Sequence, residues 1–484
     1  MSREYRKVPK NLLATGIGEV MGTILGFCAT ILSARYLGVD GFGRLTLYMG
    51  AAFVSWSIME AGLMNILVRE LSTRLKDPVE YDSFLGAFLC LIHWVCGALF
   101  AIAGILALIM NTSGDFRYIL LLLSICITAM LQALSMASVV RAHEDMEYFS
   151  MGFILRNLFL VSAIIVVTRL DAGFLAIVAA WACSYIFLWL FLRVVVKLRY
   201  RIPRPVIDTA NWKYILTEAL PLGLGQIFRR FANLIDVFIL RALSTLSNVG
   251  LFFCAYRFIM VLSGTAGTMG IAFLPVFSRL AATRGERLDK GLEKGLLFLI
   301  VAAIPLTTLF FIYSKEIVVL FFGPKFAAAQ GDLRLLSFTL LLIFPGSLFL
   351  HIFTATGKQR LWAFCTGACL LINALVDVLL IPHLGHRGAV YGTMSGEVIQ
   401  FGTGIYLMYR LGFKMSLHRL LVRPLLAGLS VGALLYGFPG VSLAAIGVHA
   451  VLALISYGLL LWVLRVFTIK DFTALLPKRA YGER

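Results

Sequence analysis

Charged residues are scarce in this sequence, and acidic residues are the scarcest. Only 14% of the 484 residues are charged, against 60% that are hydrophobic, whereas a soluble globular domain is about 25% charged and about 45–50% apolar. This deficit excludes a soluble enzyme, a disordered chain and a DNA-binding protein. No gap between the long apolar runs is large enough for a separate aqueous domain. The composition therefore predicts a polytopic membrane protein.

The motifs of common enzyme and metal chemistry are also missing. The eight cysteines lie in apolar runs, and none forms a Cys-x-x-Cys pair. Cys365 and Cys369 share a helix face, but without His or carboxylate neighbours they indicate packing rather than a metal site. The sequence has no P-loop, no nucleophile–base motif and no metal-ligand spacing. We therefore expect no enzyme activity, no cofactor and no metal site.

The apolar residues form fourteen runs, each about long enough for a helix that crosses a membrane, which takes about 20 residues. Because lipid leaves no partner for open backbone, each run is predicted to be helical. The runs are 11–36, 42–64, 84–110, 116–140, 149–168, 173–196, 214–241, 247–275, 293–313, 332–355, 361–381, 388–409, 422–438 and 443–467. The expected fold is thus an all-α polytopic membrane protein with about 14 transmembrane helices.

The basic residues predict how the chain lies in the membrane. The formal net charge is +18, from 43 Lys and Arg against 25 Asp and Glu. Most of the Lys and Arg fall between runs that would face the cytoplasm if the N-terminus does, for example in 197–213 and 279–294. By the positive-inside rule, both termini are predicted to be cytoplasmic, in the inner or cytoplasmic membrane. This distribution accounts for the net charge without a nucleic-acid partner.

The chain also repeats itself weakly. Three features of its first half recur in the same order further along: Gly43 and Gly250, Thr73-Arg74 and Thr283-Arg284, and Gly173 and Gly388. The repeat predicts two parallel six-helix lobes related by an axis along the membrane normal. The predicted boundaries are an N-lobe at 1–196, a cytoplasmic linker at 197–213, a C-lobe at 214–410, and two further helices with a cytoplasmic tail at 411–484.

Several polar and cationic residues fall inside predicted membrane helices, where a charged group costs about 2.5–3.5 kcal/mol and so indicates function. Guanidinium groups offer planar, always-charged donors that suit phosphate. The candidates for binding a phosphate or sugar are Arg156, Gln226, Arg229, Arg230, Asn233 and Arg257. The alternative is that these arginines serve internal ion pairs, such as Arg229 or Arg230 with Asp236 or Glu218.

Acidic residues inside the predicted helices are the second group of candidates. They are Glu19, Glu60, Asp236, Asp377 and Glu397. Each is a candidate for binding a coupling H⁺ or Na⁺, or for neutralising an arginine. Glu60 lies near the cytoplasmic end of its run, where a capping or pairing role is the simpler explanation. Beside Glu19, Gly18, Gly22 and Gly26 form a face suited to close helix packing.

Two segments resemble a known transporter family. ARYLGVDGFGRL at 34–45, followed by EAGL at 60–63, is similar to the first hairpin of polysaccharide transporters, the O-antigen and exopolysaccharide flippases. LIPHLGHRGAVYGT at 380–393 resembles the matching hairpin of their C-terminal half. The larger superfamily also holds the lipid II flippase and the multidrug and toxic compound extrusion antiporters. The resemblance covers about 8–410 in order and spacing, and implies a V-shaped pair of six-helix lobes around a basic cavity.

The resemblance and the arginines together predict a flippase. It would move a polyprenyl-pyrophosphate-linked oligosaccharide from the cytoplasmic to the outer leaflet by alternating access, as a monomer, among membrane lipids and other polysaccharide assembly proteins. A cation-coupled multidrug antiporter is the main alternative, although such a carrier calls for an acidic cavity. A membrane glycosyltransferase or ligase is a further alternative, but the longest outer loop, about 313–331, offers only Lys315, Glu316 and Lys325 as charges.

Overall fold

The computed structural model describes residues 4–109, 114–232, 234–283, 286–437, 443–464 and 466. In this part of the chain all regular structure is helical, with seventeen α-helices and two short 3-10 helices. Ten of the described segments are long and apolar enough to cross a membrane, counting α1 as one. The chain is therefore the all-α membrane protein that the composition predicts. The larger count of 14 transmembrane helices stays a prediction.

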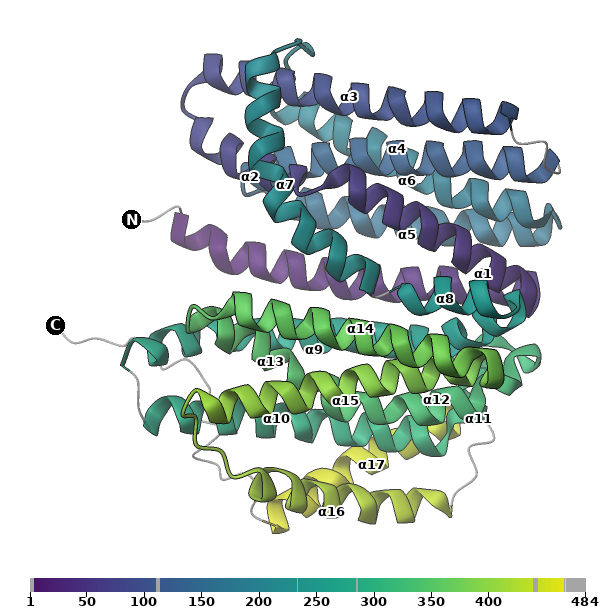
Figure 1. Ribbon diagram of the computed structural model, residues 1–484, viewed down its shortest axis with the longest axis vertical. Helices are drawn as coiled ribbons and strands as arrows, with labels where there is room; N and C mark the ends of the chain where they lie inside the picture. The colour runs from purple at the N-terminus through teal and green to yellow at the C-terminus, as the bar shows by residue number, and fades with distance from the viewer. Residues whose placement is uncertain are drawn as a thin grey trace. The chain divides into compact units, whose positions relative to one another are not determined.

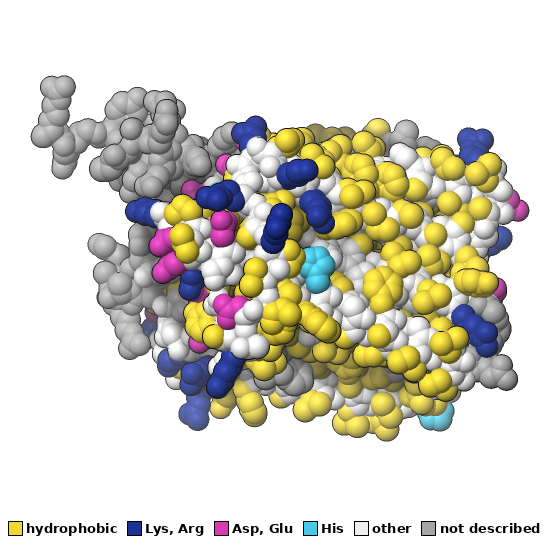
Figure 2. Space-filling model, turned by 90° about the horizontal axis from the view of Figure 1, so that it is seen from above, with side chains coloured by type: hydrophobic (Ala, Val, Ile, Leu, Met, Phe, Trp, Pro, Cys, Tyr) yellow, Lys and Arg dark blue, Asp and Glu magenta, His cyan; other side chains and the backbone are white. Residues whose placement is uncertain are grey.

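The exposed surface is hydrophobic, as a surface in contact with lipid must be. Large apolar side chains such as Leu108, Leu198 and Trp462 are mostly exposed. Figure 2 shows one face with a broad band of hydrophobic side chains and with charged side chains gathered towards its ends. A soluble protein would bury these side chains or use them in an interface.

The chain forms two compact units, Met1–Arg241 and Ala242–Arg484. The helices of the first unit are α1 (Glu4–Glu60), α2 (Leu63–Arg74), α3 (Pro78–Ile109), α4 (Gly114–Ala142), α5 (Met146–Arg169), α6 (Gly173–Arg199), α7 (Thr209–Ala232) and α8 (Ile235–Leu243), shown in Figure 1. By its contacts α7 thus belongs to the first unit, as does α8 up to Arg241. The predicted lobe boundaries, which place this segment in the C-lobe, stay a prediction.

The α1 helix consists of two helices that meet at Gly38. Gly38 has φ 70° and ψ −174°, a conformation that glycine alone adopts without strain. The break falls between the runs predicted at 11–36 and 42–64. Before it, Gly22 and Gly26 lie against Asn157 of α5, and the Asn157 amide donates to the Gly22 carbonyl oxygen at 3.1 Å. The expected glycine face is therefore the packing surface between α1 and α5.

The segment before α7 is held on α3. Backbone amide 206 donates to the Gly86 carbonyl oxygen at 3.2 Å, and the Trp212 indole donates to the Ala87 carbonyl oxygen at 2.9 Å. Asp208 caps the N-terminus of α7: its carboxylate accepts the amide hydrogens of Ala210 and Asn211, each at 3.0 Å. These bonds satisfy donors that the first helical turn leaves open, and they fix where α7 enters the first unit.

The run predicted at 214–241 is interrupted in the structure. It forms α7, which ends at Ala232, and α8, which begins at Ile235. Pro221 lies inside α7, where it removes one backbone donor and favours a bend, and Figure 1 shows α7 bent along its length. The expectation of one continuous helix is therefore wrong at this position.

The second unit consists of α9 (Leu246–Thr283), α10 (Glu286–Ile312), α11 (Ser314–Phe322), α12 (Gln330–Leu336), α13 (Leu340–Ala355), α14 (Gln359–Leu384), α15 (His386–Arg410), α16 (Leu417–Tyr436) and α17 (Leu443–Val463), with short 3-10 helices at Pro324–Ala329 and Ser337–Thr339. The region read as an outer loop, 313–331, is thus mostly helical. Phe322 and Phe326 within it are buried, and burial of these rings stabilises the short helices.

Candidate substrate and charge-pairing site

The buried Glu60 and the partly buried Arg230 form an ion pair between α1 and α7. The Arg230 Nη1 atom lies 2.8 Å from Oε2 of Glu60, which is 3% exposed. The same guanidinium lies over the Trp56 ring, 4.4 Å from its centroid, and contacts the Ser57 hydroxyl oxygen at 3.4 Å. Trp56, Ser57 and Glu60 project from one face of α1 because they are three and four residues apart. Arg230 is therefore neutralised in this structure.

The end of α1 gives Glu60 a second role. Its Oε1 accepts the backbone amide of Met64 at 3.4 Å, in the first turn of α2. Between the two helices, Ala61 and Gly62 have φ 36° and 83°, so the chain turns sharply here. A Cβ added to Gly223 of α7 would lie 2.1 Å from the Ala61 carbonyl oxygen. The turn and α7 are thus in direct backbone contact, which only a glycine at 223 permits.

A second cluster of charged side chains connects α2 to α7, outside the candidate membrane spans. Arg69 donates to Glu70 at 2.8 Å and to Glu218 of α7 at 2.9 Å. Glu70 also pairs with Arg74 and accepts the Tyr214 hydroxyl at 2.9 Å. Burial disfavours the ionised carboxylate, but the hydrogen bonds from Arg74, Arg69 and Tyr214 outweigh burial and hold the pKa of Glu70 below 4.5. The ion-pair alternative from the sequence analysis pairs Glu218 with Arg229 or Arg230. In the structure, Glu218 forms its ion pair with Arg69.

Acid is expected to weaken this contact between α2 and α7. Because the folded-state pKa of Glu70 is lowered, its stabilisation is present above the ordinary value of 4.5 and is lost as the pH falls through the folded-state pKa. Glu70→Gln should therefore lower the Tm in detergent at pH 7 and change it less well below pH 4.5. Glu80→Gln is the control, because Glu80 is exposed. An equal effect of Glu70→Gln at both pH values would contradict the assignment.

Arg156 lies inside the first unit without a carboxylate partner in the described chain. This residue of α5 is 7% exposed. Its guanidinium lies 4.0 Å from the centroid of the Tyr185 ring and 5.7 Å from that of Trp181, both on α6. Nη1 donates to the Asn157 side chain at 2.9 Å, while Nε and Nη2 have no hydrogen-bond partner among the described residues. Two donors of a buried cation are therefore left without a hydrogen-bond partner among the described residues.

The remaining predicted site residues are scattered over the two units. In the second unit, Arg257 of α9 has a buried Nε without a described hydrogen-bond partner. Glu19 is exposed, Glu397 is partly buried, and Asp236 and Asp377 are buried. Asp377 packs directly against Gly392, where an added Cβ would lie within 2 Å of its carboxylate oxygen. Asn233 and the side chains of Gln226 and Arg229 lie outside the part that the structure describes.

Several residues that complete these contacts were not predicted from the sequence. Trp56 stacks on Arg230 and Tyr185 on Arg156, but in the sequence both look like ordinary apolar residues of their helices. Nothing in the sequence around Gly223 indicates its contact with Ala61. Trp56 and Ser57 share the helical spacing of Glu60, and that spacing is the signal that points to them.

Comparisons with known proteins agree with this fold. Residues 8–281, more than half of the chain, match the family of polysaccharide biosynthesis proteins, and 221–379 match the MatE family. The lipid II flippase MurJ, in an inward closed conformation, has a similar structure, with a TM-score of 0.72 at 14% identity over 93% of this chain and 98% of that one. An inward-facing multidrug resistance MATE family transporter has a TM-score of 0.63 at 18% identity, over 82% and 98% of the two chains.

One sequence relative matches only a part of the chain. An uncharacterized membrane protein from Methanocaldococcus jannaschii is 25% identical over 170 residues, which are 35% of this chain and 34% of that protein. The aligned segment thus spans about a third of that relative's length. The structural likenesses show that the chain shares its fold with the lipid II flippase and with a MATE family transporter. Because the family match covers more than half of the chain, this multi-pass membrane protein belongs to the polysaccharide biosynthesis protein family.

Proposed function

We propose that the protein is a flippase for a polyprenyl-pyrophosphate-linked oligosaccharide, which it moves from the cytoplasmic to the outer leaflet by alternating access. The observation that carries the proposal is Arg156. A buried guanidinium whose Nε and Nη2 have no hydrogen-bond partner among the described residues, in a chain of the polysaccharide biosynthesis family, suits the phosphate oxygens of a diphosphate. The fold that the chain shares with the lipid II flippase supports a lipid-linked substrate.

The energetics of Arg156 favour an anionic ligand. A cation inside a membrane protein is costly unless a counter-charge or hydrogen bonds compensate it. The rings of Tyr185 and Trp181 and the Asn157 oxygen meet part of this cost. A phosphate oxygen that accepts from Nε and Nη2 would meet the rest. The Arg257 guanidinium supports a second contact of the same kind in the second unit.

The membrane potential would help this transport in one direction. Moving a negative charge from a negative interior to the outside releases about 2.3 kcal/mol per elementary charge per 100 mV. The diphosphate of the substrate would therefore be driven outward while it is bound, and the return of the empty carrier would be the step that needs a cation. Glu19, Asp236, Asp377 and Glu397 are the proposed candidates for that coupling cation.

The second candidate function is a cation-coupled multidrug antiporter. The MatE match at 221–379 and the likeness to MATE transporters favour it. Arg156 counts against it, because a cationic drug would be repelled by an uncompensated guanidinium. Export of a cationic dye against Na⁺ or H⁺ by the purified chain, without movement of lipid-linked sugar, would establish this alternative instead.

The test is translocation of a fluorescent polyprenyl-pyrophosphate oligosaccharide in proteoliposomes, with and without an inside-negative potential. Arg156→Ala is expected to slow translocation roughly 10- to 100-fold, since each hydrogen bond to a charged group is worth about 1.5–3 kcal/mol. Arg156→Lys keeps the charge and should restore part of the rate. The matched control is Arg193→Ala, which removes an exposed arginine that stacks on Trp189 of α6. Equal rates for Arg156→Ala and the native chain would refute the proposal.

A further inference from the structure

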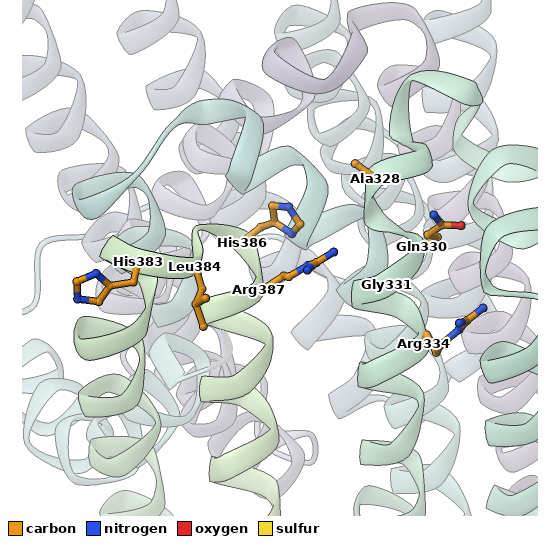
Figure 3. Close-up of a pocket in the computed structure, with 8 residues that line it drawn as sticks. All are labelled: Ala328, Gln330, Gly331, Arg334, His383, Leu384, His386 and Arg387. Carbon is orange, nitrogen blue, oxygen red and sulfur yellow. The ribbon is translucent and has the colours of Figure 1, made fainter.

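The second unit contains a basic pocket that the proposed transport path does not use. It has a volume of about 600 Å³ and lies where the turn between α14 and α15 meets the beginning of α12 (Figure 3). Its polar lining consists of Gln330, Arg334, His383, His386 and Arg387. Pockets of about 300–1,000 Å³ with a few well-placed polar groups are typical binding sites for small ligands.

The charge of the pocket is of one sign. None of its lining residues is acidic. The nearby Asp332 is fully buried and is engaged by His386, whose Nδ1 lies 2.6 Å from its carboxylate oxygen. Neither Arg334 nor Arg387 forms an ion pair within the described ranges, and both side chains are exposed. Two guanidinium groups without an ion pair in the described ranges thus belong to the lining of the pocket, although Arg334 extends from α12 on the side away from Arg387 (Figure 3).

The positions of these arginines are held by the fold. In Figure 3, Arg387 extends from α15 towards the helix that carries Gly331, and its Nη2 lies 3.8 Å from where a Gly331 Cβ would be. Arg334 lies one turn further along α12, with its guanidinium 5.4 Å from the centroid of the Phe311 ring. The contact between His386 and Asp332 ties the beginning of α15 to α12. The two arginines thus come from elements that are fixed to each other.

We propose that this pocket is a second, phosphate-binding site, which takes a phosphate or diphosphate group on Arg387 and Arg334 with Gln330 as a neutral donor. Arginine binds phosphate oxygens through paired donors, and the uncapped first turn of α15 adds a positive helix end. The Lys and Arg distribution predicts that this end of the unit faces outward. Resting on the proposed function, the site would hold the diphosphate of the transported lipid after it crosses; an anionic phospholipid headgroup offers the same chemistry.

The test is binding of radiolabelled inorganic pyrophosphate to the full chain in phosphatidylcholine nanodiscs. Replacing both Arg387 and Arg334 by glutamine should raise the Kd of this site at least tenfold, while replacement of both by lysine retains binding. Arg410→Gln, at the other end of α15, is the control for the loss of one arginine from that helix. Size-exclusion profiles check folding. Equal binding by the native chain and the double glutamine variant would overturn the proposal.

Two further arms separate the sources and the two proposals. Phosphatidylglycerol in the nanodiscs should compete with pyrophosphate in the native chain if a lipid headgroup is the natural occupant. Absence of competition assigns the site to the diphosphate of the transported lipid. Binding is repeated in the Arg156→Ala variant, so that pyrophosphate bound at the proposed transport site is told apart from pyrophosphate in this pocket. A chain that binds pyrophosphate here but moves no lipid-linked sugar would refute the flippase and leave the pocket intact.

Discussion

Glu60→Ala is expected to destabilise the first unit by about 1.5–3 kcal/mol, the usual worth of a hydrogen bond to a charged group, because Arg230 is only partly buried. The variant leaves the partly buried Arg230 guanidinium against Trp56 without the carboxylate that lies 2.8 Å from it. It also removes the acceptor for the Met64 amide at the start of α2. The measurement is the Tm of the purified chain in detergent, together with the denaturant concentration at half-unfolding.

A double-mutant cycle tells the pair apart from the two residues taken singly. Glu60→Gln and Arg230→Gln should each destabilise the first unit, and the combined variant should be less destabilised than the sum, because neither charge is then left without its partner. Glu19→Ala is the matched control, since Glu19 is an exposed carboxylate on the same helix, α1. Additive effects of the two glutamine substitutions would show that the pair does not stabilise the contact between α1 and α7.

The Glu60–Arg230 pair changes which arginine is the better candidate for phosphate. Arg230 is one of the arginines that the sequence places inside a predicted membrane helix, and by residue type it is as suitable as Arg156. In the structure its charge is already balanced by Glu60, whereas Arg156 keeps two unbonded donors. A phosphate at Arg230 would have to compete with a buried carboxylate, so we propose Arg156 rather than Arg230 as the phosphate ligand.

Local features of the fold were predictable from sequence because they depend on neighbouring residues. The break at Gly38 needs only a glycine between two apolar runs, and the glycine face of α1 needs only a spacing of four. Contacts between distant segments were not predictable in this way. Glu60 and Arg230 are 170 residues apart. From the sequence alone, Asp236 and Glu218 are equally acceptable as the carboxylate that neutralises Arg230. The interruption between α7 and α8 was missed because apolar periodicity continues across it.

Gly223→Ala adds only a methyl group, but it is expected to disrupt the contact between α7 and the turn after α1. The added Cβ would lie 2.1 Å from the Ala61 carbonyl oxygen and 2.2 Å from its carbonyl carbon. Backbone atoms cannot rotate away as a side chain can, and Ala61 and Gly62 are already in the left-handed region. We expect a loss of about 1–3 kcal/mol, towards the upper end of the range for overpacking, measured as a lower Tm.

The same substitution at an open glycine provides the control. A Cβ added to Gly104 of α3 meets no atom within 4 Å, and alanine is the better helix former, so Gly104→Ala should leave the Tm unchanged or raise it slightly. Gly223→Ala should also reduce the coupling between Glu60 and Arg230 in the double-mutant cycle, because α7 must shift to admit the methyl group. A Gly223→Ala variant with native Tm and native coupling would mean that α7 does not rest on this turn, and that Arg230 reaches Glu60 without it.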